Sequence, residues 1–289
     1  MPEQSNPLTP LLDRLRRVFQ PRPASFNRRL TTSVVLIVVL TALFGALPAV
    51  WVIYHQLQQQ IETRVEEAQI ATGQIYSTER ARLLDLTRVI AERPTLCKLA
   101  LASDRESLVP YLDTMRRGMH IDALFLVPDG QEPILSGSVS LPAPEALRLG
   151  RSLPFSDFIA LEDPPMLLLA AASEINSTDE CAANPPGWVL AIQVMNDDDM
   201  EVLAHHTGLE HSLIVGGRRA ATSLPTAPDW PLDPGAAEIV QETLTSCCTL
   251  GALEKETYQI GLAPLLDQQG QLVALSELAC PSRLSSAPL

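Results

Sequence analysis

The chain has 289 residues and a formal net charge of −13, with a sequence pI of about 4.8. This acidity disfavours nucleic acid as a partner, because nucleic acids are themselves densely negative. Aromatic residues make up only 4% of the chain, so a core must be built mainly from aliphatic side chains.

An apolar stretch without a charge runs from Ser33 to Tyr54 and holds 22 residues. A helix needs roughly 20 such residues to cross a bilayer core of about 30 Å, where its backbone must be hydrogen-bonded internally. Trp51 and Tyr54 stand where interfacial aromatic side chains are usual. We therefore predict a transmembrane helix over residues 30–54, with about 235 residues after it, enough for one large domain or two small ones.

Positive charge is concentrated before this stretch, where six arginines outnumber Glu3 and Asp13. Positive flanks stay cytoplasmic, which predicts a cytoplasmic basic tail over residues 1–29 and a C-terminal part outside the inner (plasma) membrane. The stretch and the leader before it are too long for a cleaved signal peptide. Within the tail, a short basic amphipathic helix and a disordered segment are both compatible with the sequence.

Helical periodicity continues between His55 and Glu92, where apolar residues recur three, four or seven positions apart. These residues are Leu57, Ile61, Val65, Ala68, Ile75, Leu83, Leu86 and Ile90. We predict a long helix over residues 55–92 that prolongs the membrane helix. Its apolar stripe can pack on the following domain alone, or also on a second copy of the chain in a homodimer.

Shorter elements follow. A second helix is predicted over Asp104–Gly118, with Ser103 as its cap and Gly118 at its end. About seven short strands are then expected, with helices over 197–206 and 236–245. The strand segments are 123–127, 134–139, 166–172, 188–194, 213–215, 220–222, 257–262 and 272–278. Turns join neighbouring strands, so we predict an α+β domain over residues 55–280 with a mostly antiparallel sheet and flanking helices, and a disordered tail over 281–289.

The chain has five cysteines, an odd number: Cys97, Cys181, Cys247, Cys248 and Cys280. All lie after the membrane stretch, where disulfides can persist, so one or two bridges are expected with the connectivity left open. Buried thiols are the alternative. The adjacent pair Cys247-Cys248 is interpreted as packing at the end of a helix.

The last strand pair resembles a known family. The stretch ETYQIGLAPLLDQQGQLVALSELA from Glu256 to Ala279 has an "apolar-x-P-L" strand followed by a "D-x-x-G" turn at Asp267 and Gly270. The segment ALFLVPDG from Ala123 gives a similar strand-and-turn signature. Both resemble extracytoplasmic PAS-like sensor domains of the Cache type, and the order of anchor, long helix and sheet is similar too.

Such domains form the sensory front of membrane signal-transduction proteins, including two-component histidine kinases, chemoreceptors and cyclases. The resemblance implies a small-molecule ligand bound outside and a helix movement passed across the membrane. After Ala279 the chain reads CPSRLSSAPL, without the second span of the family. This suggests a truncated or split sensor histidine kinase or a stand-alone anchored sensor. The alternative is an anchored envelope interaction or assembly protein without a small ligand.

No sequence motif for a catalytic nucleophile, phosphate loop or metalloprotease is found, so we expect no enzyme activity and no cofactor or metal in this chain. His205, His206 and His211 cluster in the sequence with Asp197, Asp198 and Asp199. We interpret them as a solvated helix with an acidic start, with a metal site as the alternative.

For a ligand pocket we single out polar and aromatic residues beside the predicted sheet, which can provide hydrogen bonds and charge on an otherwise apolar wall. They are Tyr111, Arg116, Arg117, Trp188 and Asp197. For Arg116 and Arg117, the alternative is a basic helix end that suits the helix dipole.

Overall fold

The structure is a computed structural model that describes residues 26–129, 132–139, 153–177, 179–183, 185–224, 233–253 and 256–281. The predicted amphipathic segment of the basic tail lies outside these residues, as does the predicted tail over 281–289 apart from Pro281, which ends a strand. The chain divides into two compact units, Met1–Gln59 and Gln60–Leu289.

One long helix, α2, runs from Phe26 to Ala91 without a break, which agrees with the predicted long helix after the membrane stretch. It begins four residues before the predicted start, and Pro48 lies inside it. From Leu30 onward, α2 is long and apolar enough to cross a membrane, judged by length and composition. Its side chains from Leu30 to Tyr54 are exposed, as those of a lipid-facing helix must be.

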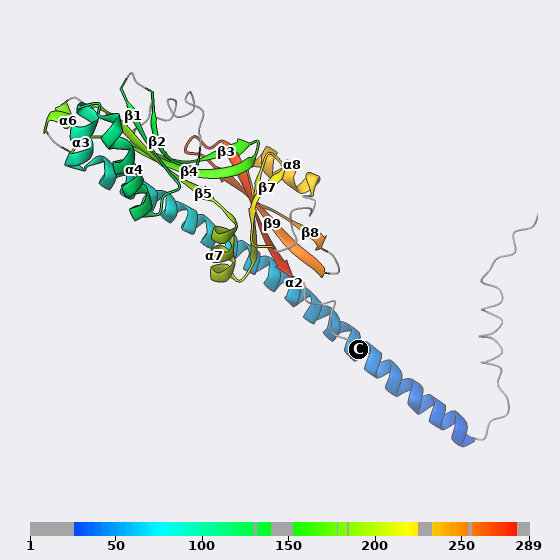
Figure 1. The fold of residues 1–289 in the computed structure, drawn as a ribbon. Coiled ribbons are helices and arrows are strands. Elements are labelled where there is room, and N and C mark those ends of the chain that lie inside the picture. The colour runs from blue at the N-terminus through cyan, green and yellow to red at the C-terminus, as the bar shows by residue number, and fades with distance from the viewer. Residues whose placement is uncertain are drawn as a thin grey trace, which may run out of the picture. The chain divides into compact units, whose positions relative to one another are not determined.

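The unit from Gln60 onward is built on two five-stranded sheets in which every strand pair is antiparallel (Figure 1). The first sheet has the strand order β2-β1-β5-β4-β3. Its strands are β1 (Ala123–Pro128), β2 (Ile134–Gly137), β3 (Phe155–Glu162), β4 (Pro165–Glu174) and β5 (Gly187–Met195). The predicted α+β class with antiparallel sheet is confirmed, although as two sheets.

The second sheet has the strand order β7-β6-β10-β9-β8. Its strands are β6 (Glu210–Val215), β7 (Arg218–Thr222), β8 (Cys247–Leu253), β9 (Glu256–Leu266) and β10 (Leu272–Pro281). Asp267 accepts backbone N–H bonds from Gln269 and Gln271 in the turn before β10, as the D-x-x-G signature predicts. The described residues therefore hold ten strands, against the expected number of about seven and the eight segments named above.

Two strands were missed from the sequence, β3 and β8. The adjacent cysteines Cys247 and Cys248 begin β8, so the prediction of a helix end at this point was wrong. The preceding helix already ends at Thr243, because Leu244 adopts a left-handed conformation with φ of 52° and closes it. The chain is then free to enter the edge strand.

The remaining helices are α3 (Pro94–Leu101), α4 (Arg105–Met119), α6 (Asp179–Ala183), α7 (Asp197–Thr207) and α8 (Pro234–Thr243). Two predicted boundaries of α4 were wrong. Asp104, not Ser103, caps it by accepting the Ser107 N–H at 3.1 Å. Gly118 lies inside the helix, which ends instead at His120 in a left-handed conformation.

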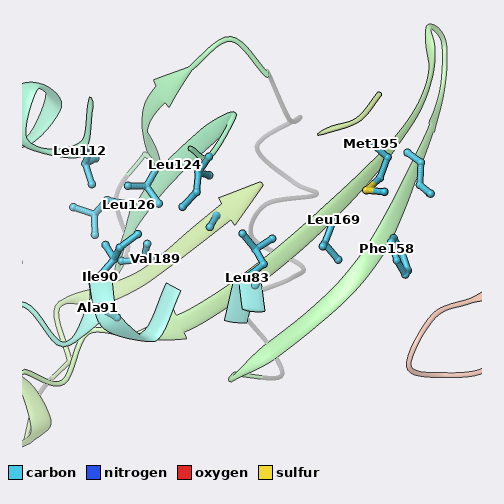
Figure 2. Packing of buried hydrophobic residues seen from close by; sticks show 14 of the residues in the cluster. Leu83, Ile90, Ala91, Leu112, Leu124, Leu126, Phe158, Leu169, Val189 and Met195 are labelled. Atoms are coloured by element: carbon cyan, nitrogen blue, oxygen red, sulfur yellow. The ribbon is translucent and has the colours of Figure 1, made fainter. Parts of the chain in front are cut away.

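The main core fills the space between the first sheet and helices α2, α3 and α4. Figure 2 shows Leu83, Ile90 and Ala91 of α2 among side chains of β1, β4 and β5, including Leu124, Leu169 and Val189. Cys97 of α3 and Cys181 of α6 form a disulfide across a sequence separation of 84, so one bridge of the predicted one or two is identified. Cys280 is a buried thiol.

Candidate functional site

A cavity of about 420 Å³ lies between α2, β5 and α7, and we call it the α2–α7 cavity. Its volume is within the range of small-molecule sites, roughly 300–1,000 Å³. It is lined by Ile75, Tyr76, Glu79, Arg82, Gln193, Met195, Asp199, Val202, Leu203 and His206.

The spacing of the lining residues follows from the elements that carry them. On α2, Glu79 follows the adjacent pair Ile75 and Tyr76 by four and three positions and Arg82 follows Glu79 by three, so these residues share one helix face. On β5, Gln193 and Met195 alternate and therefore point to the same side of the strand. On α7 the helical spacing recurs, and a capping box between Asn196 and Asp199 fixes the first turn.

The guanidinium of Arg82 is held by two neighbours. Its Nε donates to Oε2 of Glu79 at 2.7 Å, one turn earlier on α2, and its Nη2 donates to Oε1 of Gln193 at 3.1 Å. The second bond ties α2 to β5 at the wall of the cavity. Both side chains of the ion pair are partly exposed, so the pair contributes little stability on its own.

Asp199 has no such cationic partner within the described residues. Its Oδ2 accepts the Asn196 backbone N–H at 2.9 Å, as part of the capping box. Burial raises the pKa of Asp199, and the nearby carboxylates of Asp122, Asp198 and Glu79 raise it further. The cavity wall therefore carries a carboxylate whose charge is poorly compensated.

Tyr76 is a buried residue of the wall and is 4% exposed. Its ring packs edge-on against Phe158, with the centroids 5.7 Å apart. Burial raises the pKa of Tyr76 well above its usual range, while Ser276 lies close enough to lower it somewhat. Neither hydroxyl makes a hydrogen bond of ordinary geometry within the described residues. A buried hydroxyl without a partner costs stability, so it calls for a water or a ligand atom.

More buried polar atoms without a partner lie where α2 meets the second sheet. Besides the hydroxyls of Tyr76 and Ser276, they are Nε2 of Gln69 and Nδ1 of His211. We call these four residues the polar seam. Near it, Val65 and Gln69 approach Gly261 of β9 so closely that a Cβ there would collide with them.

The residues predicted as ligand contacts lie apart from this cavity. Arg116 and Arg117 both bond to Asp113 on their own helix, at 2.9 and 2.6 Å. Tyr111 of α4 packs against the main core on the α2 side of the first sheet. Trp188 of β5 packs with the cluster of β1 and β3–β5 side chains that includes Phe125, Phe155 and Leu190.

Asp197 has a structural contact. Its Oδ1 accepts the backbone N–H of Thr222 at 2.8 Å and so joins α7 to β7. The cavity-lining acids Glu79 and Asp199 were not singled out from the sequence. Asp199 is the last of three consecutive aspartates that begin with Asp197. Nothing in the sequence distinguishes this partly buried aspartate from the two exposed ones.

The fold is shared with several solved sensory domains. The ligand-binding domain of the Campylobacter jejuni chemoreceptor Tlp3, solved in complex with L-valine, is 11% identical with a TM-score of 0.51, over 79% of this chain and 94% of that one. The periplasmic domain of Vibrio cholerae LuxQ is 13% identical with a TM-score of 0.52, over 72% of this chain and 95% of that one.

The chain has the fold of bacterial extracytoplasmic sensory domains. The expected Cache/PAS-like architecture is thereby confirmed, with the two sheets following one long helix. These neighbours are sensory rather than catalytic domains. No protein-family model matches the sequence, and the search of curated proteins found no match.

Proposed function

We propose that this chain is the membrane-anchored sensory part of a signal-transduction protein and that it binds a small solute in the α2–α7 cavity. The observation that carries this proposal is the position of the cavity on α2. Tyr76, Glu79 and Arg82 line it, and they belong to the same unbroken helix as the apolar stretch from Leu30. A solute bound here contacts a helix that continues into the proposed anchor.

The fold supports this proposal, because Tlp3 is a chemoreceptor whose sensory domain has been solved with isoleucine and L-valine. The arginine-rich segment before the apolar stretch supports a cytoplasmic N-terminus and a domain outside the inner membrane. The sensor histidine kinases remain our preferred parent class. The cavity favours solute binding over a purely structural envelope role, for which a groove or open sheet edge would be the relevant feature.

A homodimer through residues 55–92 is part of the proposal. Ile70 supports it, because this apolar side chain of α2 is 59% exposed and is not used by the domain core. Light scattering of the full chain in detergent tests it, with Ile70→Glu expected to weaken the dimer. A monomer at all concentrations contradicts this part of the proposal.

Solute binding is tested by a thermal-shift screen of the full-length chain in detergent against amino acids, organic acids and polyamines. Val202 is 56% exposed at the cavity, so Val202→Trp should obstruct the cavity without disturbing the core. Val89→Trp is the matched control, since Val89 is an exposed valine of α2 that does not line the cavity.

At least one solute class should raise the melting temperature of the wild type and of Val89→Trp, but not of Val202→Trp. The proposal fails if no class gives a shift, or if Val202→Trp binds as well as the wild type.

A further inference from the structure

The α2–α7 cavity offers two features that specify a ligand more narrowly than its size does. One is the poorly compensated carboxylate of Asp199. The other is the hydroxyl of Tyr76, which is buried, belongs to a lining side chain and has no hydrogen-bond partner within the described residues. Resting on the proposed function, we infer that the cavity binds a solute with a protonated amine and an apolar body, anchored by Asp199.

The charge balance of the wall favours a cation. Glu79, Asp199 and the nearby Asp122 and Asp198 are acidic, and the electrostatic effect of the other three on Asp199 shows that they lie within reach of it. Arg82 also lines the cavity, but its charge is offset by the carboxylate of Glu79, to which its Nε donates, and its Nη2 donates to Gln193. A bound ammonium would offset the repulsion among the carboxylates, whereas a bound anion would add to it.

The position of Asp199 suits a fixed anchor. One carboxylate oxygen, Oδ2, is held by the Asn196 N–H in the capping box, which fixes the side chain on the first turn of α7. A preorganised carboxylate binds an ammonium without first having to be ordered. Tyr76 lines the same cavity and lies within electrostatic reach of Asp199, so a ligand held by Asp199 lies close to this side chain.

The rest of the wall suits an apolar body of modest size. Ile75, Met195 and Leu203 come from α2, β5 and α7 and cover three sides of the cavity with aliphatic surface. His206 and Val202 are exposed residues at its edge. A branched amine of about four to six carbons would bury its chain against this surface.

The test uses three probes with the same apolar body: 3-methylbutylamine, 3-methylbutanoate and 3-methylbutanol. Binding to the full-length chain in detergent is measured by isothermal titration calorimetry. The amine should bind more tightly than the anion or the alcohol. Asp199→Asn should weaken amine binding roughly 10- to 100-fold, because it removes a charged hydrogen-bond partner. Asparagine can still accept the Asn196 N–H, so the helix cap is kept.

Glu201→Gln is the matched control, since Glu201 follows Asp199 on α7, is exposed and does not line the cavity. It should leave amine affinity within about twofold, as expected for an exposed charge. The inference is overturned if Asp199→Asn binds the amine as well as the wild type does. It is also overturned if the anion or the alcohol binds most tightly and this binding is lost in Val202→Trp. That result would leave the proposed solute binding in the cavity intact. If none of the probes and no solute of the wider screen binds, the proposed function itself fails.

Discussion

The helix α2 approaches the second sheet closely at Gly261 of β9, because this residue has no side chain. A Cβ added to Gly261 of β9 would collide with Cγ1 of Val65 and lie 2.8 Å from Nε2 of Gln69. Real Cβ atoms are not found at such distances, so Gly261→Ala must push α2 and β9 apart or distort one of them. Overpacking of this kind typically costs about 1–3 kcal/mol.

For a domain of 150–250 residues, each kcal/mol changes the melting temperature by about 2–4 °C. Gly261→Ala should therefore lower it by about 2–12 °C, measured by thermal unfolding of the full-length chain in detergent. Gly73→Ala is the matched control, because Gly73 lies on α2 and a Cβ there meets nothing within 4 Å. Alanine favours the helix by about 0.5–1 kcal/mol, so this variant should be as stable as the wild type or slightly more so.

A second substitution separates collision from other causes. Val65→Ala removes the atom that the new Cβ would strike, at the cost of a small cavity. The double variant should be more stable than the sum of the two single effects predicts, by about 0.5–3 kcal/mol. If Gly261→Ala melts like the wild type, or if the two effects simply add, the close packing of α2 on β9 is refuted.

Three further changes test the rest of the domain. Replacing Cys97 and Cys181 by serine should lower the free energy of unfolding by about 2–5 kcal/mol, since the bridge closes a long loop; an unchanged melting temperature in reductant would contradict this. His211 is 1% exposed and burial lowers its pKa to about 4, so the unfolded chain binds more protons between pH 6.5 and 4. The contribution of neutral His211 to the free energy of unfolding should therefore be complete above about pH 6.5 and fall by up to about 3 kcal/mol towards pH 4. If the melting temperature of His211→Gln falls as much over this pH range as that of the wild type, the prediction is contradicted. Arg219 and Glu277 form a buried ion pair at 2.7 Å, with side chains 8% and 1% exposed. Arg219→Met should lower the free energy of unfolding, measured by chemical denaturation, by about 3–5 kcal/mol, because it leaves the Glu277 carboxylate buried without its partner. The double variant Arg219→Met with Glu277→Leu should lose much less. Equal losses in the two variants would contradict a role for the ion pairing.

Elements with a strong repeating pattern could be predicted from the sequence. The long helix, the strands around the Asp-Gly turn and the last strand pair each carry a local signal that needs no tertiary contact. The strand β3 carries none, because Ser156 and Asp157 interrupt its apolar residues. Besides the N–H of its neighbour Phe158, Asp157 is compensated by groups distant in the sequence: Arg80 of α2 at 3.3 Å and the backbone N–H of Gln268 at 2.9 Å. Its burial in a strand could not be predicted before those contacts were known.

The same reasoning explains why the candidate site was not found in the sequence. Arg116 and Arg117 attract attention as charges beside a predicted sheet, but Asp113 pairs with both from one turn earlier on the helix. Glu79 and Asp199 are separated by 120 positions, and each lies on a helix whose other charges are solvated. Only the packing of α7 against α2 and β5 makes Asp199 a partly buried group.

The two contacts of α2 within the domain differ in kind. Against the first sheet the helix places Leu83 and Ile90, both fully buried in a continuous apolar core. Near the second sheet it places Val65 and Ala68 in a smaller apolar cluster, and also Gln69 and Tyr76, whose Nε2 and hydroxyl have no partner within the described residues. Moving α2 on the first sheet exposes apolar surface, which is unfavourable. Moving it at the polar seam can instead give the unpaired polar atoms a hydrogen bond to water or to a new partner. Movement of α2 should therefore occur more readily against the second sheet.

Tyr76 connects that expectation to the α2–α7 cavity, because the same side chain lines the cavity, packs on Phe158 of the first sheet and lies close to Ser276 of the second. A ligand in the cavity contacts Tyr76, a residue at the boundary between the two contacts of α2. The difference between the ligand's affinities for two positions of α2 sets the largest change that the ligand can cause in the equilibrium between them. Gly261→Ala forces α2 away from the second sheet and so provides the matching perturbation without a ligand. If the ligand acts through this contact, the substitution should change ligand affinity as well as stability.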